Sequence, residues 1–371
     1  MLLVRRPIGR VVLVLAITLI GVACAGAPTT IGPSAPNKTA AAEQARTFVT
    51  YGMADSLGNY GEQFTTFCLQ EFGFDCNRPG RSQAEDLFSA EEIQKFDAEK
   101  NNPGGLMADA NIAFIPQAVQ VNTLADYEAP NAALLPDHLH GPGWVAVFVG
   151  VPTIMVNVGF LESHGLPIPH SWADLLNPAY AGMIGLPRVG TGGSGTFAFV
   201  AMNLAAGGSL DNWEPGVAYA KQLLPNLTSA ASVDTFERGE VPISVRSDFN
   251  NASLLKTLLE HGVNAEIFVP TDGSVYATQT LIVNRYDVAH QDFAKMFMEW
   301  VLTDEAQVIF AEFGARPIRS VVGDNPLVVP DDARALWLPD ADYSNVQTVD
   351  ATTLDPNEIL DIWENQVLSG S

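Results

Sequence analysis

Basic residues are scarce in this sequence, which has 19 Lys and Arg against 42 Asp and Glu and a formal net charge of −23 at pH 7. A surface this acidic repels phosphate backbones and anionic headgroups, which argues against nucleic acid or anionic lipid as a partner. Charged residues of either sign make up only 16% of the chain, whereas 47% is hydrophobic. A chain of 371 residues with this balance can bury a sizeable core, so we expect a globular protein of two domains.

Long apolar runs are absent after residue 23, because no later segment has eighteen apolar residues without a charge. We therefore expect no membrane span in the mature chain. Residues 1–23 place Arg5, Arg6 and Arg10 before an apolar run that ends in small residues, the layout of a secretory signal peptide. That run is too short to span a bilayer comfortably, and it predicts an exported protein.

Cys24 follows Gly21-Val22-Ala23, and this stretch resembles a bacterial lipoprotein signal, in which the cysteine becomes the lipidated N-terminus. Gly21 departs from the usual leucine, and the alternative is ordinary cleavage nearby, for instance after Ala25. Residues 24–45 are rich in Ala, Pro, Thr and Ser without an apolar period, which predicts a flexible tether. The expected location is the periplasm or the outer face of the cytoplasmic membrane, with a lipid anchor at Cys24.

Only two further cysteines, Cys68 and Cys76, occur in the chain, within FCLQEFGFDC. An exported protein meets an oxidising compartment, so we expect a structural disulfide that joins a helix end to the next strand. The alternative is a pair of buried free thiols. A zinc site would need further ligands nearby, and the sequence has none there.

Strand and helix patterns alternate along the first part of the mature chain. ARTFVTYGM is a short β-rich run, and the following ADSLGNYGEQFTTFCLQEF has helical spacing with Asp55 or Ser56 as candidate N-caps. FGFDC is expected as a second strand, Ser89 to Glu92 as a capping box opening a helix through Lys100, and MADANIAFIP as a third strand. The alternation predicts an α/β fold with mainly parallel sheets flanked by helices.

A second series of strands and helices follows the long β-branched run WVAVFVGVPTIMVNVGF. MIGLPRV, GEVPISVRSD and AEIFVP are expected as strands, and helices are expected in FAFVAMNLAAGG, NWEPGVAYAKQLLPNL and SLLKTLLEHG. Two amphipathic helices occupy HQDFAKMFMEWVLTDEAQVIFAEFG, and a last helix is expected near 356–368. The order indicates a second α/β unit.

The order of SWADLLNPAYAGMIGLP, SGTFAF, GEVPISV, FVPTDGSVY and AKMFMEWVLTDEAQVIFAEFGARPIR resembles the type II bacterial extracellular solute-binding proteins that serve ABC importers. It is similar in particular to the branch that binds iron(III), polyamines, thiamine and phosphonates. The resemblance covers roughly residues 46–325 and implies two α/β lobes that hold a ligand in the cleft between them. The family serves a membrane permease, so a small-molecule solute and an ABC permease are the implied partners.

The lobes implied by this resemblance have definite bounds. Lobe one comprises residues 46–150 and 275–371, lobe two comprises residues 154–270, and hinge crossings lie at 150–153 and 270–276. VFVGVPTIMVN is too long for one ordinary strand, and its central glycine and proline independently suggest a bend between lobes. We expect a monomer without a cofactor or a resident metal.

The glycine-rich stretch VGTGGSGTFAF lies between an expected strand and an expected helix. A P-loop needs a lysine where Thr196 follows Gly195, and a nucleophile elbow needs a glycine two places after Ser194. What remains is a helix N-terminus with free amides and small side chains, which favours an anionic or strongly polar ligand group. We expect Ser194, Gly195 and Thr196 to contact ligand; a plain helix start is the alternative.

Further candidate ligand residues stand at the ends of other expected strands, where open α/β sheets bind ligands, or at the two expected crossings. They are Asp55, Ser56, Asn59, Ser89, Thr153, Asp248, Asn250 and Tyr276. The alternatives are simple helix capping for Asp55, Ser56, Asn59 and Ser89, and a core position for Tyr276. Iron-binding relatives carry adjacent tyrosines where this chain has Asp248, Phe249 and Asn250, so ferric iron held by two phenolates is in doubt.

We therefore predict an extracytoplasmic solute receptor that is not an enzyme and binds an anionic or zwitterionic solute, such as a phosphonate or phosphate ester. Iron(III), polyamine or thiamine binding by the same fold are alternatives. A secreted hydrolase is a competing class, but no histidine is placed as a partner for Ser194. A lipoprotein that only senses or scaffolds with an old receptor fold is the third possibility.

Overall fold

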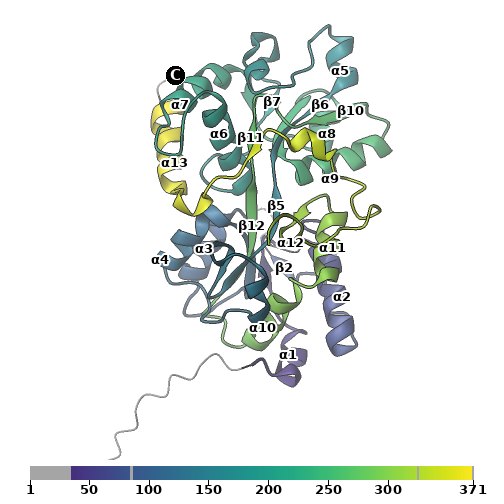
Figure 1. Cartoon of the computed structure of the whole chain (residues 1–371), viewed down its shortest axis with the longest axis vertical. Coiled ribbons are helices and arrows are strands. Elements are labelled where there is room, and N and C mark those ends of the chain that lie inside the picture. Colours follow the sequence, from purple (N-terminus) through teal and green to yellow (C-terminus); the bar gives the residue numbers. More distant parts are fainter. Residues whose placement is uncertain (1–34, 84–86, 324–325, 370–371) are drawn as a thin grey trace, which may run out of the picture. The chain divides into compact units, whose positions relative to one another are not determined.

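Two β-sheets flanked by helices organise the chain into two lobes (Figure 1). A computed structural model describes residues 35–83, 87–323 and 326–369. The predicted signal peptide and Cys24 lie outside the described residues. In the part of the chain that is described, no helix combines the length and apolar character needed to cross a membrane.

The sheet of lobe one has the order β13-β5-β12-β3-β1-β2, with β4 paired to β5. Its strands are β1 (Thr50–Tyr51), β2 (Ser82–Gln83), β3 (Met107–Asn111), β4 (His140–Gly141), β5 (Trp144–Gly150), β12 (Ala277–Val283) and β13 (Arg316–Pro317). The helices of this lobe are α1 (Lys38–Gln44), α2 (Tyr60–Phe72), α3 (Ser89–Ala98), α4 (Ile115–Gln120), α10 (Gln291–Trp300), α11 (Asp304–Glu312) and α12 (Ile318–Val321). Stacked phenylalanines join α2 to α10, with the Phe64 and Phe297 ring centroids 4.3 Å apart.

The sheet of lobe two has the order β10-β6-β9-β7-β8. Its strands are β6 (Pro152–Asn157), β7 (Ile184–Gly185), β8 (Leu227–Thr228), β9 (Ile243–Ser247) and β10 (Ala265–Phe268). The helices are α5 (Val158–Ser163), α6 (Gly193–Ala205), α7 (Glu214–Leu223), α8 (Val233–Glu237) and α9 (Asp248–Glu260). Helix α6 is almost entirely buried, as its apolar sequence requires.

The lobes are joined where strands leave one sheet and enter the other. Strand β5 ends at Gly150 and β6 begins at Pro152, inside the range expected for the first crossing. The return path runs from β10 in lobe two to β12 in lobe one, through β11 (Ser274–Val275). Because the chain returns in the opposite direction, β12 pairs antiparallel with both β5 and β3. In lobe two, β6 pairs antiparallel with β9 and β10, whereas β7 pairs parallel with β8 and β9. Each sheet is mixed, whereas the sequence pattern predicted mainly parallel sheets.

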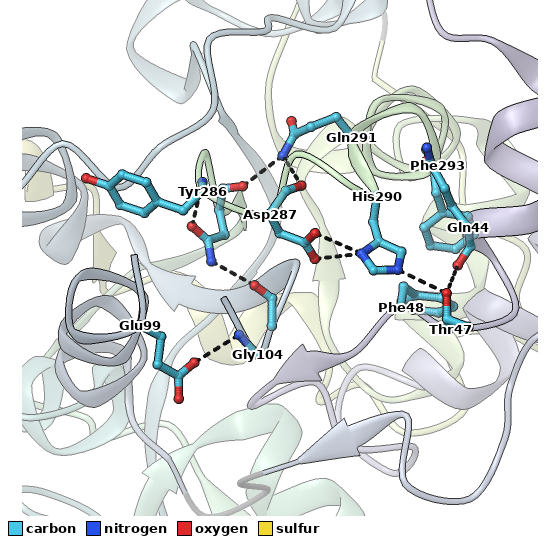
Figure 2. Close-up of polar contacts among 12 residues, drawn as sticks. Gln44, Thr47, Phe48, Glu99, Gly104, Tyr286, Asp287, His290, Gln291 and Phe293 are labelled. Atoms are coloured by element: carbon cyan, nitrogen blue, oxygen red, sulfur yellow. Dashed lines mark hydrogen bonds and ion pairs between the residues drawn. The ribbon is translucent and has the colours of Figure 1, made fainter. Parts of the chain in front are cut away.

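The segment before β1 differs from the flexible tether predicted for residues 24–45. Residues 38–44 form α1, capped by the Asn37 side chain, and α1 packs against α10. The Gln44 side chain accepts a hydrogen bond from the Phe293 amide over 2.9 Å, and the His290 ring joins Thr47 to Asp287 (Figure 2). The Asn37 amide at the start of α1 donates to Asp292 over 2.9 Å, so both ends of this short alanine-rich helix have partners in lobe one.

The C-terminal segment also differs from its predicted place in lobe one. Residues 327–337 pack on lobe one, and β14 (Val346–Gln347) then pairs with β11 at the second crossing. Helix α13 (Pro356–Ile362) and the π-helix η9 (Trp363–Leu368) lie beside α6 and α7 of lobe two (Figure 1). The Trp363 ring packs edge-on against Phe199 of α6. The segment is a third connection between the lobes.

The region of the two cysteines is only partly as predicted. Cys68 of α2 and Cys76 form a disulfide whose Cα atoms are 5.8 Å apart. The predicted strand FGFDC is absent from the described structure. Helix α2 ends at Phe72 and is capped by Gly73, which has a φ of 76°, and a loop carries Cys76. The disulfide therefore joins a helix to a loop.

Candidate ligand-binding site

A cavity of about 360 Å³ lies between the lobes, near the crossing strands. Lobe one supplies Gly52, Leu57, Leu87, Phe88, Ser89, Glu92, Asp109 and Gln279 to its wall. Lobe two supplies Pro187, Arg188, Gly192, Gly193, Ser194, Gly195, Phe249 and Asn250. Residues 50–51 and 107–111 are parallel strands, so the carboxyl ends of β1 and β3 open onto this cavity, as open α/β sheets require.

The lobe-two wall of the cavity is the N-terminus of α6. Gly192 is the N-cap residue, and no side chain caps the helix. The amides of residues 193–195 therefore have no acceptor within the helix, and the positive end of the helix dipole lies at the cavity. The Ser194 hydroxyl is 3.2 Å from Ser247 Oγ and accepts from Asn250 Nδ2 at 3.2 Å. This wall therefore presents mainly hydrogen-bond donors to the cavity.

Two different steric requirements explain the glycines of this turn. A Cβ atom on Gly192 would lie 2.7 Å from Phe88 Cδ1, and one on Gly193 would lie 2.8 Å from Asn111 Nδ2. Both neighbours belong to lobe one, so these glycines let the lobes approach. A Cβ atom on Gly195 would instead meet the backbone carbonyls of Pro187 and Arg188. Gly195 is therefore required by packing within lobe two.

The lobe-one wall carries the side-chain oxygen atoms of Glu92, Asp109 and Gln279, and the buried Asn111 lies next to it at the end of β3. Asp109 and Asn111 alternate along β3 and share one face of the sheet, and Gln279 is paired opposite Asn111 on β12. The register of β12 with β5 shifts between Gln279 and Thr280, a bulge of the kind that re-aims side chains near sites. Gln279 Oε1 and Asn111 Nδ2 are buried without a hydrogen-bond partner among the described residues.

Glu92 is the most buried acidic residue of the cavity wall, with only 1% of the residue exposed. It lies over Gly52, whose φ of 65° and lack of a side chain leave room for the carboxyl group. Its Oε2 atom has no hydrogen-bond partner in the described structure. Burial, followed by the negative charges of Asp109 and Glu91, raises the pKa of Glu92 well above its usual range.

Asp109 lies beside Glu92, and one of its two carboxyl oxygen atoms has a hydrogen-bond donor. Its Oδ2 atom accepts a hydrogen bond from the Tyr60 hydroxyl over 2.8 Å. Burial raises the pKa of Asp109 to about 7, although the Tyr60 hydrogen bond lowers it. Two carboxyl groups therefore share a buried wall, and neither is paired with a cation of the described chain. Groups of this kind cluster at functional sites.

Positive charge is found at the mouth of the cavity. Arg188 has 68% of its side chain exposed and lies 4.0 Å from the Glu91 carboxylate of the opposite lobe. The Ala90 amide donates to the Thr191 carbonyl over 3.2 Å, again from lobe one to lobe two. The lobes therefore touch along one side of the cavity, between the start of α3 and the glycine-rich turn.

Four of the eleven predicted ligand residues line this cavity: Ser89, Ser194, Gly195 and Asn250. Ser89 does not start the predicted capping box. Its hydroxyl accepts from the Asn111 amide over 3.0 Å, while Phe88 is the N-cap residue and its amide donates to Glu91. Glu92 is consequently free of a capping role and turns toward the cavity.

The three predicted residues before α2 have other surroundings. Asp55 makes an ion pair of 2.6 Å with the buried Arg81. Ser56 lines a separate groove with residues of lobe two. Asn59 is the N-cap residue of α2 with a φ of 53°, and its side chain donates to the Ile309 carbonyl. Neither Asp55 nor Ser56 is the N-cap that the sequence suggested.

The remaining predicted residues also lie outside the wall of this cavity. Thr153 is buried in β6 and donates to the Arg246 carbonyl, and Thr196 donates to the Gly192 carbonyl. Asp248 accepts from the amides of Val151 and Phe249 at the first crossing. Tyr276 lines a different, more apolar cavity beside the C-terminal segment.

Sequence reasoning missed Glu92, Asp109 and Gln279 as wall residues. An acidic residue within MADANIAF is a signal, because Asp109 interrupts a strand whose other residues are mostly apolar. In the sequence, the predicted capping box is a sufficient reason for Glu92, so no pattern marks it as a residue of the cavity wall. In the described ranges, no group of three or more His, Cys, Asp or Glu residues is arranged to hold a metal ion.

Residues 107–346 match the family described as bacterial extracellular solute-binding protein, and the chain belongs to that family. No curated protein sequence matches the chain. Among solved structures, the periplasmic binding protein AfuA from Actinobacillus pleuropneumoniae, with fructose-6-phosphate bound, has a TM-score of 0.66 at 19% identity, over 86% of this chain and 98% of that one.

Two further solved structures share the fold. The Atu4243-GABA receptor gives a TM-score of 0.63 at 14% identity, over 86% of this chain and 97% of the other. Iron-bound HitA from Pseudomonas aeruginosa gives a TM-score of 0.61 at 16% identity, over 86% and 98%. The fold is therefore that of two-lobed periplasmic binding proteins, and these neighbours bind chemically different ligands.

Proposed function

We propose that this protein is the extracytoplasmic binding component of an ABC importer, which captures a small anionic or zwitterionic solute between its lobes and delivers it to a membrane permease. The observation that carries the proposal is the uncapped N-terminus of α6, whose free amides and Ser194 hydroxyl face a cavity bounded by both lobes. Such a terminus stabilises an anionic group. Export as a monomer with a lipid anchor at Cys24 is part of the same proposal.

Closure of the lobes on the solute supplies the signal for delivery. The wall residues come from both lobes, so a ligand gains all of its contacts only when the lobes are together. Binding then shifts the population toward the closed form, which is the form a permease would recognise. The contacts between Ala90 and Thr191 and between Glu91 and Arg188 would form at the same step.

Binding without chemistry is favoured over hydrolysis by the surroundings of Ser194. Its hydroxyl has Ser247 and Asn250 as partners, and neither is a base that could take its proton. The described wall of the cavity also contains no histidine. Purified protein should therefore bind its solute without converting it.

The nature of the solute can be tested directly. Protein purified without refolding should retain a solute, which mass spectrometry of the denatured preparation would identify as a small molecule with an anionic group. A thermal-shift series of phosphate esters, phosphonates, polyamines, thiamine and ferric iron then checks the class. Stabilisation by a cation alone, with no response to any anionic compound, would contradict the proposal.

A further inference from the structure

The two walls of the cavity between the lobes are opposite in hydrogen-bonding character. The α6 terminus offers amide donors, whereas Glu92, Asp109 and Gln279 offer oxygen atoms. Glu92 Oε2 and Gln279 Oε1 are buried and lack donors among the described residues. An uncapped helix terminus on one wall thus faces unpartnered acceptors on the other.

A buried carboxyl group without a partner is costly in a folded protein. The charges that act on Glu92 are those of Asp109 and Glu91, both of which are negative. Arg188, the cation of the described cavity wall, is mostly exposed and points to Glu91 at the mouth. The buried wall therefore lacks a positive charge from the described chain, and a ligand can supply it.

We infer that the solute is bipolar, with its anionic group at the N-terminus of α6 and a protonated amine against Glu92, Asp109 and Gln279. This inference rests on the proposed function and narrows it from anionic or zwitterionic solutes to zwitterions. An ammonium group has three donors, and the wall presents oxygen atoms from three side chains. A single amine can satisfy the acceptors, and its positive charge favours the ionised form of the two carboxyl groups.

The test uses pairs of probes that differ only in the amine. Aminoalkyl phosphates with two to five carbons are each compared with the alkyl phosphate of the same length by calorimetric titration at low salt. We expect at least one amino compound to bind about ten-fold or more tightly than its partner, the range for hydrogen bonds to charged groups. Alkylamines without phosphate should bind weakly, because they leave the α6 terminus empty.

Substitutions in the lobe-one wall test whether the preference for the amino compound arises there. Glu92→Gln preserves the size of the side chain and should reduce the preference for the amino compound to about two-fold or less, while the alkyl phosphate binds as before. Asp109→Asn should reduce the preference in the same direction. Glu62→Gln removes an exposed carboxylate from α2 of the same lobe and serves as the matched control, with the preference retained.

The outcomes separate this inference from the proposed function. Equal affinity for the amino and plain phosphates in the unaltered protein would overturn the bipolar assignment and leave the anion-binding proposal standing. A preference that survives both Glu92→Gln and Asp109→Asn would also overturn it, since the amine would then lie elsewhere. Failure of every phosphate to bind would contradict both.

Discussion

Tyr343 donates a hydrogen bond from its hydroxyl to Asp248 Oδ2 over 2.8 Å and so fastens the C-terminal segment to the first crossing between the lobes. Asp248 Oδ1 accepts from the amides of Val151 and Phe249, each at 2.9 Å. The guanidinium of Arg316 lies 3.9 Å over the Tyr343 ring. Asp248, which the sequence predicted as a ligand contact, therefore organises the first crossing. The C-terminal segment, which is the third connection between the lobes, holds Asp248 in place through Tyr343.

Tyr343→Phe should lower the free energy of unfolding by about 1–3 kcal/mol, because it leaves a buried carboxyl oxygen without its partner. It should also loosen the lobes, which small-angle scattering of the ligand-free protein would register as a larger radius of gyration. Tyr286→Phe is the matched control, since its ring points away from the polar cluster around Asp287 (Figure 2). Unchanged stability in Tyr343→Phe would mean that this contact does not hold the hinge.

The disulfide should be present in the exported protein and should stabilise it. Alkylation without a reductant is expected to leave Cys68 and Cys76 unlabelled in an intact-mass measurement. Reduction should lower the free energy of unfolding by about 2–3 kcal/mol, the entropic estimate for a loop of this length. The separation of the cysteines is 8 residues. Labelling of both thiols in the untreated protein would disprove the bond.

The order of the elements could be predicted from the sequence because the signals for them are local. The glycine-rich turn before FAFVAMNLA marks the start of α6, and a glycine and proline mark the first crossing. Residues 38–44 were expected to be a tether, because a short alanine-rich helix is only marginally stable alone. Its helicity depends on contacts with α10, about 250 residues further along the chain.

The candidate site was harder to predict, because it depends on contacts between distant segments. Ser194 and Asn250 follow from their positions at a helix start and a strand end. Glu92 satisfies a local capping pattern, and only the approach of β3 and Gly52 reveals that it faces the cavity. Likewise, Asp248 was predicted to contact ligand because its partners Val151 and Tyr343 lie about a hundred residues away on either side, where no local pattern indicates them.

Ser194→Ala should weaken binding of an anionic solute by about 1–3 kcal/mol, the range for a hydrogen bond to a charged group. The free energy of unfolding of the ligand-free protein should change little, because Ser194 lies inside the helix and does not cap it. Ser163→Ala, on the exposed side of α5, is the control. Calorimetric titration and denaturant unfolding distinguish the two effects. A loss of stability with binding per folded molecule intact would show that Ser194 is structural.

Gly193→Ala should impede closure of the lobes. The added Cβ atom would lie 2.8 Å from Asn111 Nδ2, and Asn111 is held by bonds from its own amide to Ser89 and from Ala113 to its side chain. Overpacking of this kind costs about 1–3 kcal/mol, here only in the closed form. Affinity should therefore fall while unfolding of the open form is unchanged.

Gly159→Ala is the matched control for this variant. Its Cβ atom would meet nothing closer than 3.7 Å, and it lies in α5 of the same lobe. Scattering at saturating solute should show a compact particle for the control and a more open one for Gly193→Ala. Equal compaction and equal affinity in the two variants would show that closure does not bring Gly193 against Asn111.

The stability of the ligand-free protein should fall as pH rises from about 4 to 7, and Asp109 should be one cause. Its pKa is raised from 3.8 to about 7 by burial, so in this range the folded state binds a proton that the unfolded state has released. Stability is then lost as pH rises, at a slope of up to about 1.4 kcal/mol per pH unit for one proton. The buried Glu92 and the Tyr60 hydroxyl face the same carboxyl group.

Asp109→Asn removes one of the titrating groups and should reduce this slope, because the pKa values of Glu92 and Asp248 are also raised by burial; denaturant unfolding at pH 5, 6, 7 and 8 would measure the change. Glu62→Gln should leave the slope as it is, because its carboxylate is exposed. A slope in Asp109→Asn equal to that of the unaltered protein would mean that Asp109 does not hold a proton in the folded state over this pH range.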